Sequence, residues 1–247
     1  MSDKCVIVTG AGSGIGRATA LRFAADGAMV MVSDIQETAA RSVSNEILAM
    51  GGQATPVETD VADGKSVQNL IEIAAASSGR IDVIVSSAGI WRPSTIAETE
   101  EEDWDQVFAV NTKSLFWLAK YAHFHLRNSA GTIIAVSSVT AFKGSRNFGA
   151  YNASKAALIA TVRNLALEFA GDGIRVNCVC PGFVETPLAA QVIVNRGGEG
   201  AREAVLRAHP LGLGQPDDVA GPIHFLASDD ARWITGVAMM VDGGSSV

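Results

Sequence analysis

The stretch KCVIVTGAGSGIG, residues 4–16, decides the fold of this chain. Residues 4–9 form an apolar, β-branched run typical of a buried strand, and a helical pattern follows the glycines to about Asp26. Four glycines alternate in between, at positions 10, 12, 14 and 16. Glycines at a strand-to-helix turn let the backbone approach a pyrophosphate, which then sits on the helix N-terminus. A merely tight turn is the alternative, but it would not need four glycines.

The rest of the chain repeats the order of strand and helix. Strands are expected at residues 4–9, 28–33, 53–59, 81–86, 132–138, 174–180 and 237–241, with helices between them. This alternation predicts an α/β fold with a doubly wound, parallel, seven-stranded, Rossmann-like sheet. We expect a single domain over residues 1–247, in which residues 186–214, rich in Gly and Arg, form a substrate lid. A capping box at Thr99–Glu102 predicts one long helix from there to about Arg127.

The composition excludes several classes of protein. With 48% hydrophobic and 18% charged residues, the chain is typical of a compact globular protein. Its net charge of -7 and its lack of a basic cluster argue against nucleic acid and anionic membranes as partners. The first residues lack the apolar core of a signal peptide, and Cys5, Cys178 and Cys180 lie in apolar runs, so we expect reduced thiols in the cytoplasm. The four histidines form no metal-binding pattern, so no metal site is expected.

A second informative stretch is Tyr151-Asn152-Ala153-Ser154-Lys155. On a helix, Tyr151 and Lys155 lie on the same face, one turn apart. The charge of Lys155 is expected to favour the phenolate and to lower the pKa of Tyr151 from its usual value of about 10. Such a tyrosine can serve as a general acid or base for an alcohol or a ketone. Taken alone, the pair would also fit an ordinary amphipathic helix.

These motifs make the chain similar to the short-chain dehydrogenase/reductase family. Residues 9–16 resemble its T-G-x-x-x-G-x-G signature, and Tyr151-x-x-x-Lys155 resembles its defining pair. Ser138 stands thirteen residues before Tyr151, as the family's serine does, and Asn111 stands where the family has its catalytic asparagine. One departure is the serine pair at residues 86–87, where the family usually reads Asn-Asn.

The resemblance implies an oxidoreductase that transfers a hydride between NAD(H) and a secondary alcohol or ketone. Tyr151 would exchange the proton, and Lys155 would hold the tyrosinate and the nicotinamide ribose. Ser138 would hydrogen-bond the substrate oxygen, and Asn111 would position a water. The implied cofactor contacts are Gly10, Ser13, Gly14, Ile15, Gly16, Asp34, Asp60, Val61, Ala88, Gly89, Tyr151, Lys155, Pro181, Gly182, Val184 and Thr186. The resemblance also implies a homotetramer that pairs through the helices carrying the aromatic residues 104, 108, 116 and 117.

Asp34 bears on the choice of cofactor. A carboxylate at the end of the second strand accepts hydrogen bonds from the ribose hydroxyls of NAD and repels the 2′-phosphate of NADP. Ser13 stands where NADP-preferring relatives tend to carry a basic residue, so NAD is the expected cofactor. Structural alternatives remain: Asp34 and Thr186 each fit a helix N-cap, and Asn111 fits a helix-interior residue bonded to its own backbone.

The substrate is expected among the loops at the carboxyl ends of the strands. Pocket candidates are Trp91, Thr140, Phe142, Arg146, Phe148, Phe183, Leu188 and Val192. Arg92, Arg146 and Arg196 could pair with the carboxylate of a hydroxy acid or a sugar acid, or could be solvated loop arginines. Two other functions remain open: a non-catalytic NAD sensor, which would not need the whole Tyr, Lys, Ser and Asn set, and an epimerase or dehydratase of nucleotide sugars. The latter usually carries a longer C-terminal domain than this chain has room for.

Overall fold

The structure, a computed structural model that describes all 247 residues, is built on one sheet. The strands are β1 (Cys5–Thr9), β2 (Met29–Asp34), β3 (Gln53–Glu58), β4 (Val83–Ser86), β5 (Thr132–Val136), β6 (Arg175–Pro181) and β7 (Ala238–Val241). All neighbours are parallel, in the order β3-β2-β1-β4-β5-β6-β7. The predicted doubly wound, seven-stranded sheet is confirmed.

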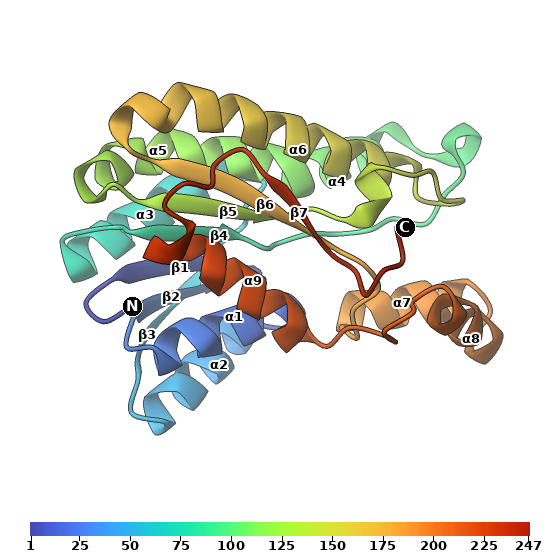
Figure 1. Cartoon of the computed structure of the whole chain (residues 1–247), viewed down its shortest axis with the longest axis horizontal. Coiled ribbons are helices and arrows are strands. Elements are labelled where there is room, and N and C mark those ends of the chain that lie inside the picture. The colour runs from blue at the N-terminus through green and yellow to red at the C-terminus, as the bar shows by residue number, and fades with distance from the viewer.

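Helices cover both faces of the sheet, as Figure 1 shows. One layer consists of α3 (Gly64–Ser78), α5 (Ser114–Ser129) and α6 (Gly149–Phe169), and the other of α1 (Gly14–Ala25), α2 (Glu37–Ala49) and α9 (Pro216–Ala227). Each layer encloses its own core, one with Ile84 and Leu118 and the other with Val32 and Phe23 completely buried. A sheet buried on both faces needs near-continuous apolar strands, which explains the β-branched runs of the sequence.

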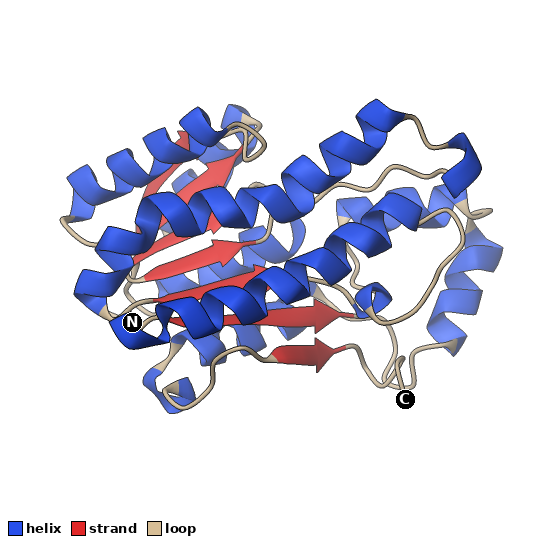
Figure 2. Ribbon diagram, turned by 90° about the horizontal axis from the view of Figure 1, so that it is seen from above, coloured by secondary structure: helices blue, strands red, loops and turns tan.

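The order of the strands places a crevice above the centre of the sheet. From β1 the chain builds β2 and β3 to one side and β4 to β7 to the other. The loops after β1 and β4 therefore diverge, and ligands of such sheets bind where they part. Two further helices, α7 (Pro187–Asn195) and α8 (Glu199–Arg207), lie beyond the carboxyl ends of the strands, which the arrows of Figure 2 mark. None of the helices is both long and apolar enough to cross a membrane.

The predicted long helix from Thr99 is wrong in two respects. α4 (Glu101–Phe108) begins after an N-cap at Glu100, and no capping box forms. Thr99 donates its hydroxyl to the carbonyl of Thr95 at 2.7 Å instead, because a 3-10 turn over Ile96–Glu98 precedes the helix. A π-helical turn, residues 109–113, then separates α4 from α5. Turns of this kind inside helices often occur at functional sites.

The segment 186–214 is more regular than its composition suggested, because it holds α7 and α8. Thr186 is the N-cap of α7: its hydroxyl accepts from the N–H of Ala189 at 3.2 Å, and Pro187 occupies the first turn. The structural alternative for Thr186 is thus present, and it is compatible with a contact to a ligand, since Thr186 also lines the cavity described below.

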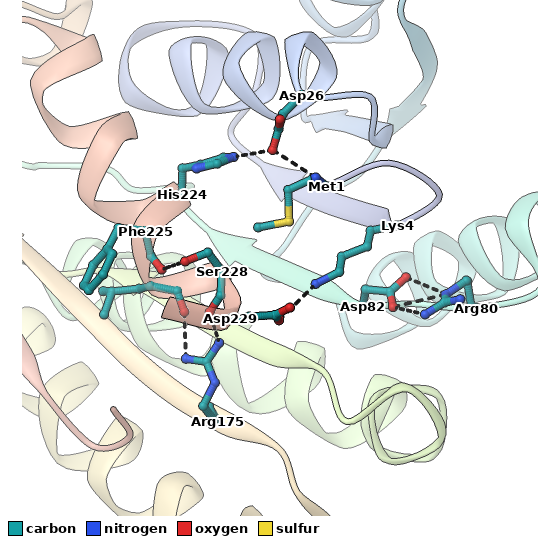
Figure 3. Close-up of polar contacts among 11 residues, drawn as sticks. Met1, Lys4, Asp26, Arg80, Asp82, Arg175, His224, Phe225, Ser228 and Asp229 are labelled. Carbon is teal, nitrogen blue, oxygen red and sulfur yellow. Dashed lines mark hydrogen bonds and ion pairs between the residues drawn. The ribbon is translucent and has the colours of Figure 1, made fainter. Parts of the chain in front are cut away.

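Charged side chains with partners in the protein lie at the amino edge of the sheet, where the strands begin (Figure 3). Arg80 donates to both carboxylate oxygens of the buried Asp82, at 2.6 to 3.1 Å, and Asp82 also accepts from the N–H of Cys5 at 2.9 Å. Arg175 donates to the carbonyls of Leu226 and Ser228, at 2.7 and 3.2 Å. A guanidinium at this position satisfies carbonyls that the end of α9 leaves without a helical partner.

Candidate functional site

A cavity of about 960 Å³ lies at the carboxyl ends of the strands. Its walls come from the glycine loop after β1, the loops after β2 to β6, and the helices α7 and α8. All sixteen residues that the sequence suggested as cofactor contacts line it. The fold thus brings together, in the crevice of the sheet, residues that are up to 176 positions apart in the sequence, from Gly10 to Thr186.

The glycine loop lies too close to its surroundings for larger residues. Gly10 has φ +64°, and a Cβ on it would lie 2.8 Å from the Cα of Ala88. A Cβ on Gly14 would lie 3.1 Å from the methyl group of Thr186. Ser13, the N-cap of α1, makes no side-chain cap hydrogen bond. The first turn of α1 therefore offers its N–H groups to an anion in the cavity.

Asp34 is held in place by two backbone hydrogen bonds. Its Oδ2 accepts from the N–H of Gly12 at 2.9 Å and its Oδ1 from the N–H of Gln36 at 3.0 Å. The N-cap of α2 is Gln36, so the suggestion that Asp34 fills that position is wrong. Asp34 instead ties the glycine loop to the end of β2 and lines the cavity there. Asp60, in the loop after the neighbouring strand β3, also lines the cavity, and its Oδ1 accepts from the N–H of Ala62 at 2.9 Å.

Tyr151 and Lys155 lie on one face of α6 at the floor of the cavity, as predicted. The Nζ of Lys155 is 5.6 Å from the centre of the Tyr151 ring and donates to the carbonyl of Val136 at 2.8 Å. Burial raises the pKa of Tyr151 from 10.0 to about 12, and a hydrogen bond with Ser138 offsets only part of that rise. Burial also lowers the pKa of Lys155 from 10.5 to about 8.

The prediction that the pKa of Tyr151 lies below its usual value is therefore wrong. Loss of water is the largest influence on both groups and moves each pKa towards the neutral form. Any charge placed beside them in the cavity acts through the same low dielectric and shifts both groups strongly.

Ser138 follows β5 as the N-cap of a 3-10 turn, Val139–Ala141, and is buried. Its Oγ accepts from the N–H and from the hydroxyl of Thr140, at 3.2 and 3.0 Å. With Thr140 donating to it, the Ser138 hydroxyl is left to donate its own proton towards the cavity.

Asn111 lies in the π-helical turn and is buried beside the cavity. Its Oδ1 accepts from the N–H of Ile90 at 2.8 Å, and its Nδ2 donates to the carbonyl of Ile90 and to Ser154 Oγ, both at 3.0 Å. The alternative of an asparagine bonded to its own backbone is wrong. Asn111 fastens the loop after β4 to α6, and one acceptor position on its Oδ1 stays free.

The serine pair that departs from the family pattern lies where the loop after β4 passes β1. The hydroxyl of Thr9 accepts from the N–H groups of Ser87 and Ala88, at 3.2 and 3.4 Å. Thr9 therefore braces this loop from β1, and Ala88 remains against Gly10.

His209 is a residue that the sequence did not single out. It lines the cavity after α8, and its Nε2 accepts from the N–H of Phe183 at 3.0 Å. Its Nδ1 donates to the carbonyl of Val205 at 2.7 Å. A lone histidine after an amphipathic helix carries no recognisable motif, so only the tertiary contact shows that it holds the turn of Pro181 and Gly182.

The expected substrate residues divide into two groups. Those that line the cavity are Thr140, Phe148, Phe183, Leu188, Val192, Arg92 and Arg196. Trp91, Phe142 and Arg146 do not line it. Trp91 lies behind Phe148, with ring centres 5.0 Å apart, and donates to the carbonyl of Asn147 at 3.1 Å, while Phe142 and Arg146 are exposed on the loop before α6.

Comparison with known proteins identifies the family. Residues 10–246 match the model of a protein family described as enoyl-(acyl carrier protein) reductase. Over 246 residues, 99% of this chain and 98% of the relative, the sequence is 39% identical to the 3-oxoacyl-(acyl-carrier-protein) reductase FabG of Thermotoga maritima. The chain belongs to the short-chain dehydrogenase/reductase family.

Two solved structures are also similar to this chain. A 7α-hydroxysteroid dehydrogenase in complex with NADH and 7-oxo glycochenodeoxycholic acid has a TM-score of 0.94 and 34% identity, covering 98% of this chain and 94% of its own. A 3-ketoacyl-(acyl-carrier-protein) reductase of Brucella melitensis in complex with NADH has a TM-score of 0.90 and 33% identity, covering 100% and 99%. Membership of this family makes the protein an oxidoreductase with the fold of these enzymes.

Proposed function

We propose that this short-chain dehydrogenase/reductase transfers a hydride between NAD(H) and a secondary alcohol or ketone. The observation that carries the proposal is the joint position of Tyr151, Lys155 and Ser138 in one cavity with the glycine loop of β1. The nicotinamide supplies the hydride chemistry when it is bound. The residues of this chain bind, orient and move the proton.

The residues at one end of the cavity fit a dinucleotide. The uncapped first turn of α1 would hold the pyrophosphate, and Asp34 would accept hydrogen bonds from the adenosine ribose. The carboxylate of Asp34 would repel a 2′-phosphate, which is why we propose NAD and not NADP. The NADH complexes of the two related structures support the choice.

The proton moves at the other end. In oxidation, Tyr151 Oη would take the hydroxyl proton of the alcohol, and in reduction it would return it. Lys155 would hydrogen-bond the nicotinamide ribose and lower the pKa of Tyr151 once the cofactor is bound, while Ser138 would donate to the substrate oxygen. We assign to Asn111 the role of positioning a water, since its Oδ1 keeps one acceptor position free.

The class of substrate follows from the walls of the cavity. Apolar side chains such as Phe183, Leu188 and Val192 stand beside arginines, which suits a hydroxy acid, a sugar acid or the corresponding keto acid. The related 7α-hydroxysteroid dehydrogenase was solved with a keto acid, which supports this choice. We propose that residues 186–214 close over the substrate.

A spectrophotometric assay tests the function. The protein is mixed with NAD⁺ or with NADP⁺ and a panel of secondary alcohols, hydroxy acids and sugar acids, and the absorbance of the reduced nicotinamide is followed. We expect turnover with NAD⁺ and a kcat/KM at least about tenfold higher than with NADP⁺, the effect of one charge-assisted hydrogen bond. A preference for NADP⁺ would contradict the role of Asp34. Tight NADH binding without turnover of any alcohol would point to a sensor.

We also propose that the protein is a homotetramer in the cytoplasm. Phe116 and Phe124 are 46% and 67% exposed on α5, and Trp104 stacks on Phe108 of α4 with ring centres 5.1 Å apart. An aromatic surface of this kind is typical of an interface, and the three free cysteines are buried and fit a reducing compartment. Light scattering of the purified protein measures the number of subunits.

A further inference from the structure

The charges around the cavity are divided between its two ends. The carboxylates that line it, Asp34 and Asp60, both lie at the end proposed for adenosine. At the end beyond Tyr151 the charged residues lining the cavity are Arg92, Lys143 and Arg196, and no carboxylate lines it there. This is unusual for a chain with 26 acidic and 19 basic residues. A cavity of one sign attracts ligands of the opposite sign.

The three cations differ in the partners that they already have within the protein. Arg92 forms an ion pair with Asp103 at 3.4 Å and donates to the side chain of Gln106 at 3.0 Å. Lys143 donates to the carbonyl of Ser245 at 3.3 Å. Both therefore have polar partners of their own.

Arg196 has no hydrogen-bond or carboxylate partner for its guanidinium. It lies over the ring of Phe148, with Cζ 4.8 Å from the ring centre. A guanidinium stacked on a ring keeps its N–H groups at the rim free to bind an anion. His209, which also lines the cavity, has both ring nitrogens in hydrogen bonds within the protein.

Phe148 contacts both the reacting tyrosine and the cation. Its ring meets that of Tyr151 edge to face, with centres 5.7 Å apart, and it is buried against Trp91 and Val192. The ring of Phe148 thus contacts both the cation and the reacting tyrosine and offers them an apolar surface. An apolar spacer packed on this ring would join the reacting carbon to an anion on Arg196.

We propose that the substrate is an anionic ketone or alcohol whose negative group is separated from the reacting carbon by an apolar spacer, and that Arg196 binds this group. The inference rests on the function proposed above and narrows it. The anion is a carboxylate or a phosphate, since a guanidinium binds both in the same forked geometry. Lys143 adds positive charge on the same side of the cavity.

A matched set of ketones tests the proposal. The set contains 7-oxooctanoate, its neutral methyl ester, 2-oxooctanoate, and acetoacetyl-CoA as the phosphate-bearing ketone. With NADH, we expect kcat/KM for 7-oxooctanoate to exceed that for the ester and for 2-oxooctanoate about tenfold or more, and to fall with rising ionic strength. A preference for acetoacetyl-CoA that depends on Arg196 would assign the anion to a phosphate.

Two arginine variants provide the control. Arg196→Gln should lose about 10- to 100-fold in kcat/KM for the preferred anion, through a higher KM, and leave the methyl ester unchanged. Arg146→Gln, which changes an exposed arginine outside the cavity, should alter neither substrate. Equal effects of Arg196→Gln on acid and ester, or a wild-type preference for the ester, would overturn the inference.

Failure of the proposed function is a separate result. It would show as no turnover of any ketone, neutral or anionic. The inference is then decided by the melting temperature of the NADH complex with each ketone. A rise with 7-oxooctanoate or acetoacetyl-CoA that Arg196→Gln removes supports the anion site, and no rise with either overturns it.

Discussion

Charged side chains have different kinds of partner at the two edges of the sheet. At the amino edge, Arg80 pairs with Asp82, and Arg175 binds the carbonyls at the end of α9 (Figure 3). At the carboxyl edge, Lys155 is buried with a carbonyl as its partner, and Arg196 has no acidic partner. Arg92 at the carboxyl edge does pair with Asp103, so Arg196 is the cation there that remains available to a ligand.

The direction of the helices explains the difference. In a parallel α/β fold the helices begin at the carboxyl edge and end at the amino edge, so carbonyls without helical partners gather at one edge and N–H groups at the other. Arg175 satisfies carbonyls at the amino edge, whereas the N-cap residue Ser13 leaves the first turn of α1 without a side-chain partner at the carboxyl edge. Substitutions at the amino edge should therefore change stability alone, whereas those at the carboxyl edge should change activity, with or without a change in stability.

Tyr151→Phe should have the largest effect, because it removes the group that exchanges the proton. We expect kcat for alcohol oxidation to fall about 10²- to 10⁴-fold. Binding of NADH, measured by fluorescence, and the melting temperature should stay near the wild-type values. Near-normal turnover of this variant would contradict the role of Tyr151.

Lys155→Met should show that the buried lysine at the carboxyl edge lowers the stability of the protein. The pKa of Lys155 is about 8 in the folded protein against 10.5 for an exposed lysine, so below pH 8 the folded state carries a buried charge that costs about 3 kcal/mol. Between pH 8 and 10 this lysine takes up a proton on unfolding, so it contributes a rise in the stability of the wild type. The thiols of Cys5 and Cys178, whose pKa values are raised in the folded protein, act in the opposite direction in wild type and variant alike. The variant should be more stable at pH 7 and lack this rise.

Urea unfolding of the wild type and of Lys155→Met at a series of pH values measures how the free energy of unfolding depends on pH. The range stops at pH 10 because Tyr151, whose pKa is raised to about 12, begins to act in the opposite direction above that value. A difference in stability between the two proteins that does not shrink from pH 8 to 10 would contradict the assignment.

Asp82→Ala should lower stability without changing catalysis. The substitution leaves the N–H of Cys5 without its side-chain acceptor and Arg80 without its partner. We expect the free energy of unfolding to fall by about 1–3 kcal/mol. The kcat for the best alcohol, measured at a temperature well below the transition, should equal that of the wild type. A loss of kcat would show that the two edges are not independent.

Asp26→Asn should have the smallest effect. Asp26 accepts from the amino group of Met1 and pairs with His224, both at 3.0 Å, and these contacts lower its pKa. Because the carboxylate is half exposed, water and salt screen the pair, and we expect a loss below about 1 kcal/mol that high salt removes. A larger, salt-independent loss in urea unfolding would contradict a screened surface pair.

Several expectations failed where one segment of the chain competes with another. Thr99 does not cap α4, because its hydroxyl donates to the carbonyl of Thr95, at the start of the 3-10 turn that precedes the helix. The pKa of Tyr151 moves up, because burial, which depends on the whole fold, is the largest influence on it. Of the candidate arginines Arg146 and Arg196, only the second lines the cavity, which the packing of α7 and the loop before α6 decides.

The sequence by itself determined the sheet, the crevice and the residues that gather in it. Strand and helix periods, the glycines after β1 and the Tyr151 to Lys155 spacing are local properties, and the geometry of parallel α/β units follows from them. Only the tertiary structure decided which charges remain without a partner, how Asn111 and His209 hold the loops, and which protonation state burial favours. These depend on distances between segments far apart in the chain, and no local pattern contains them.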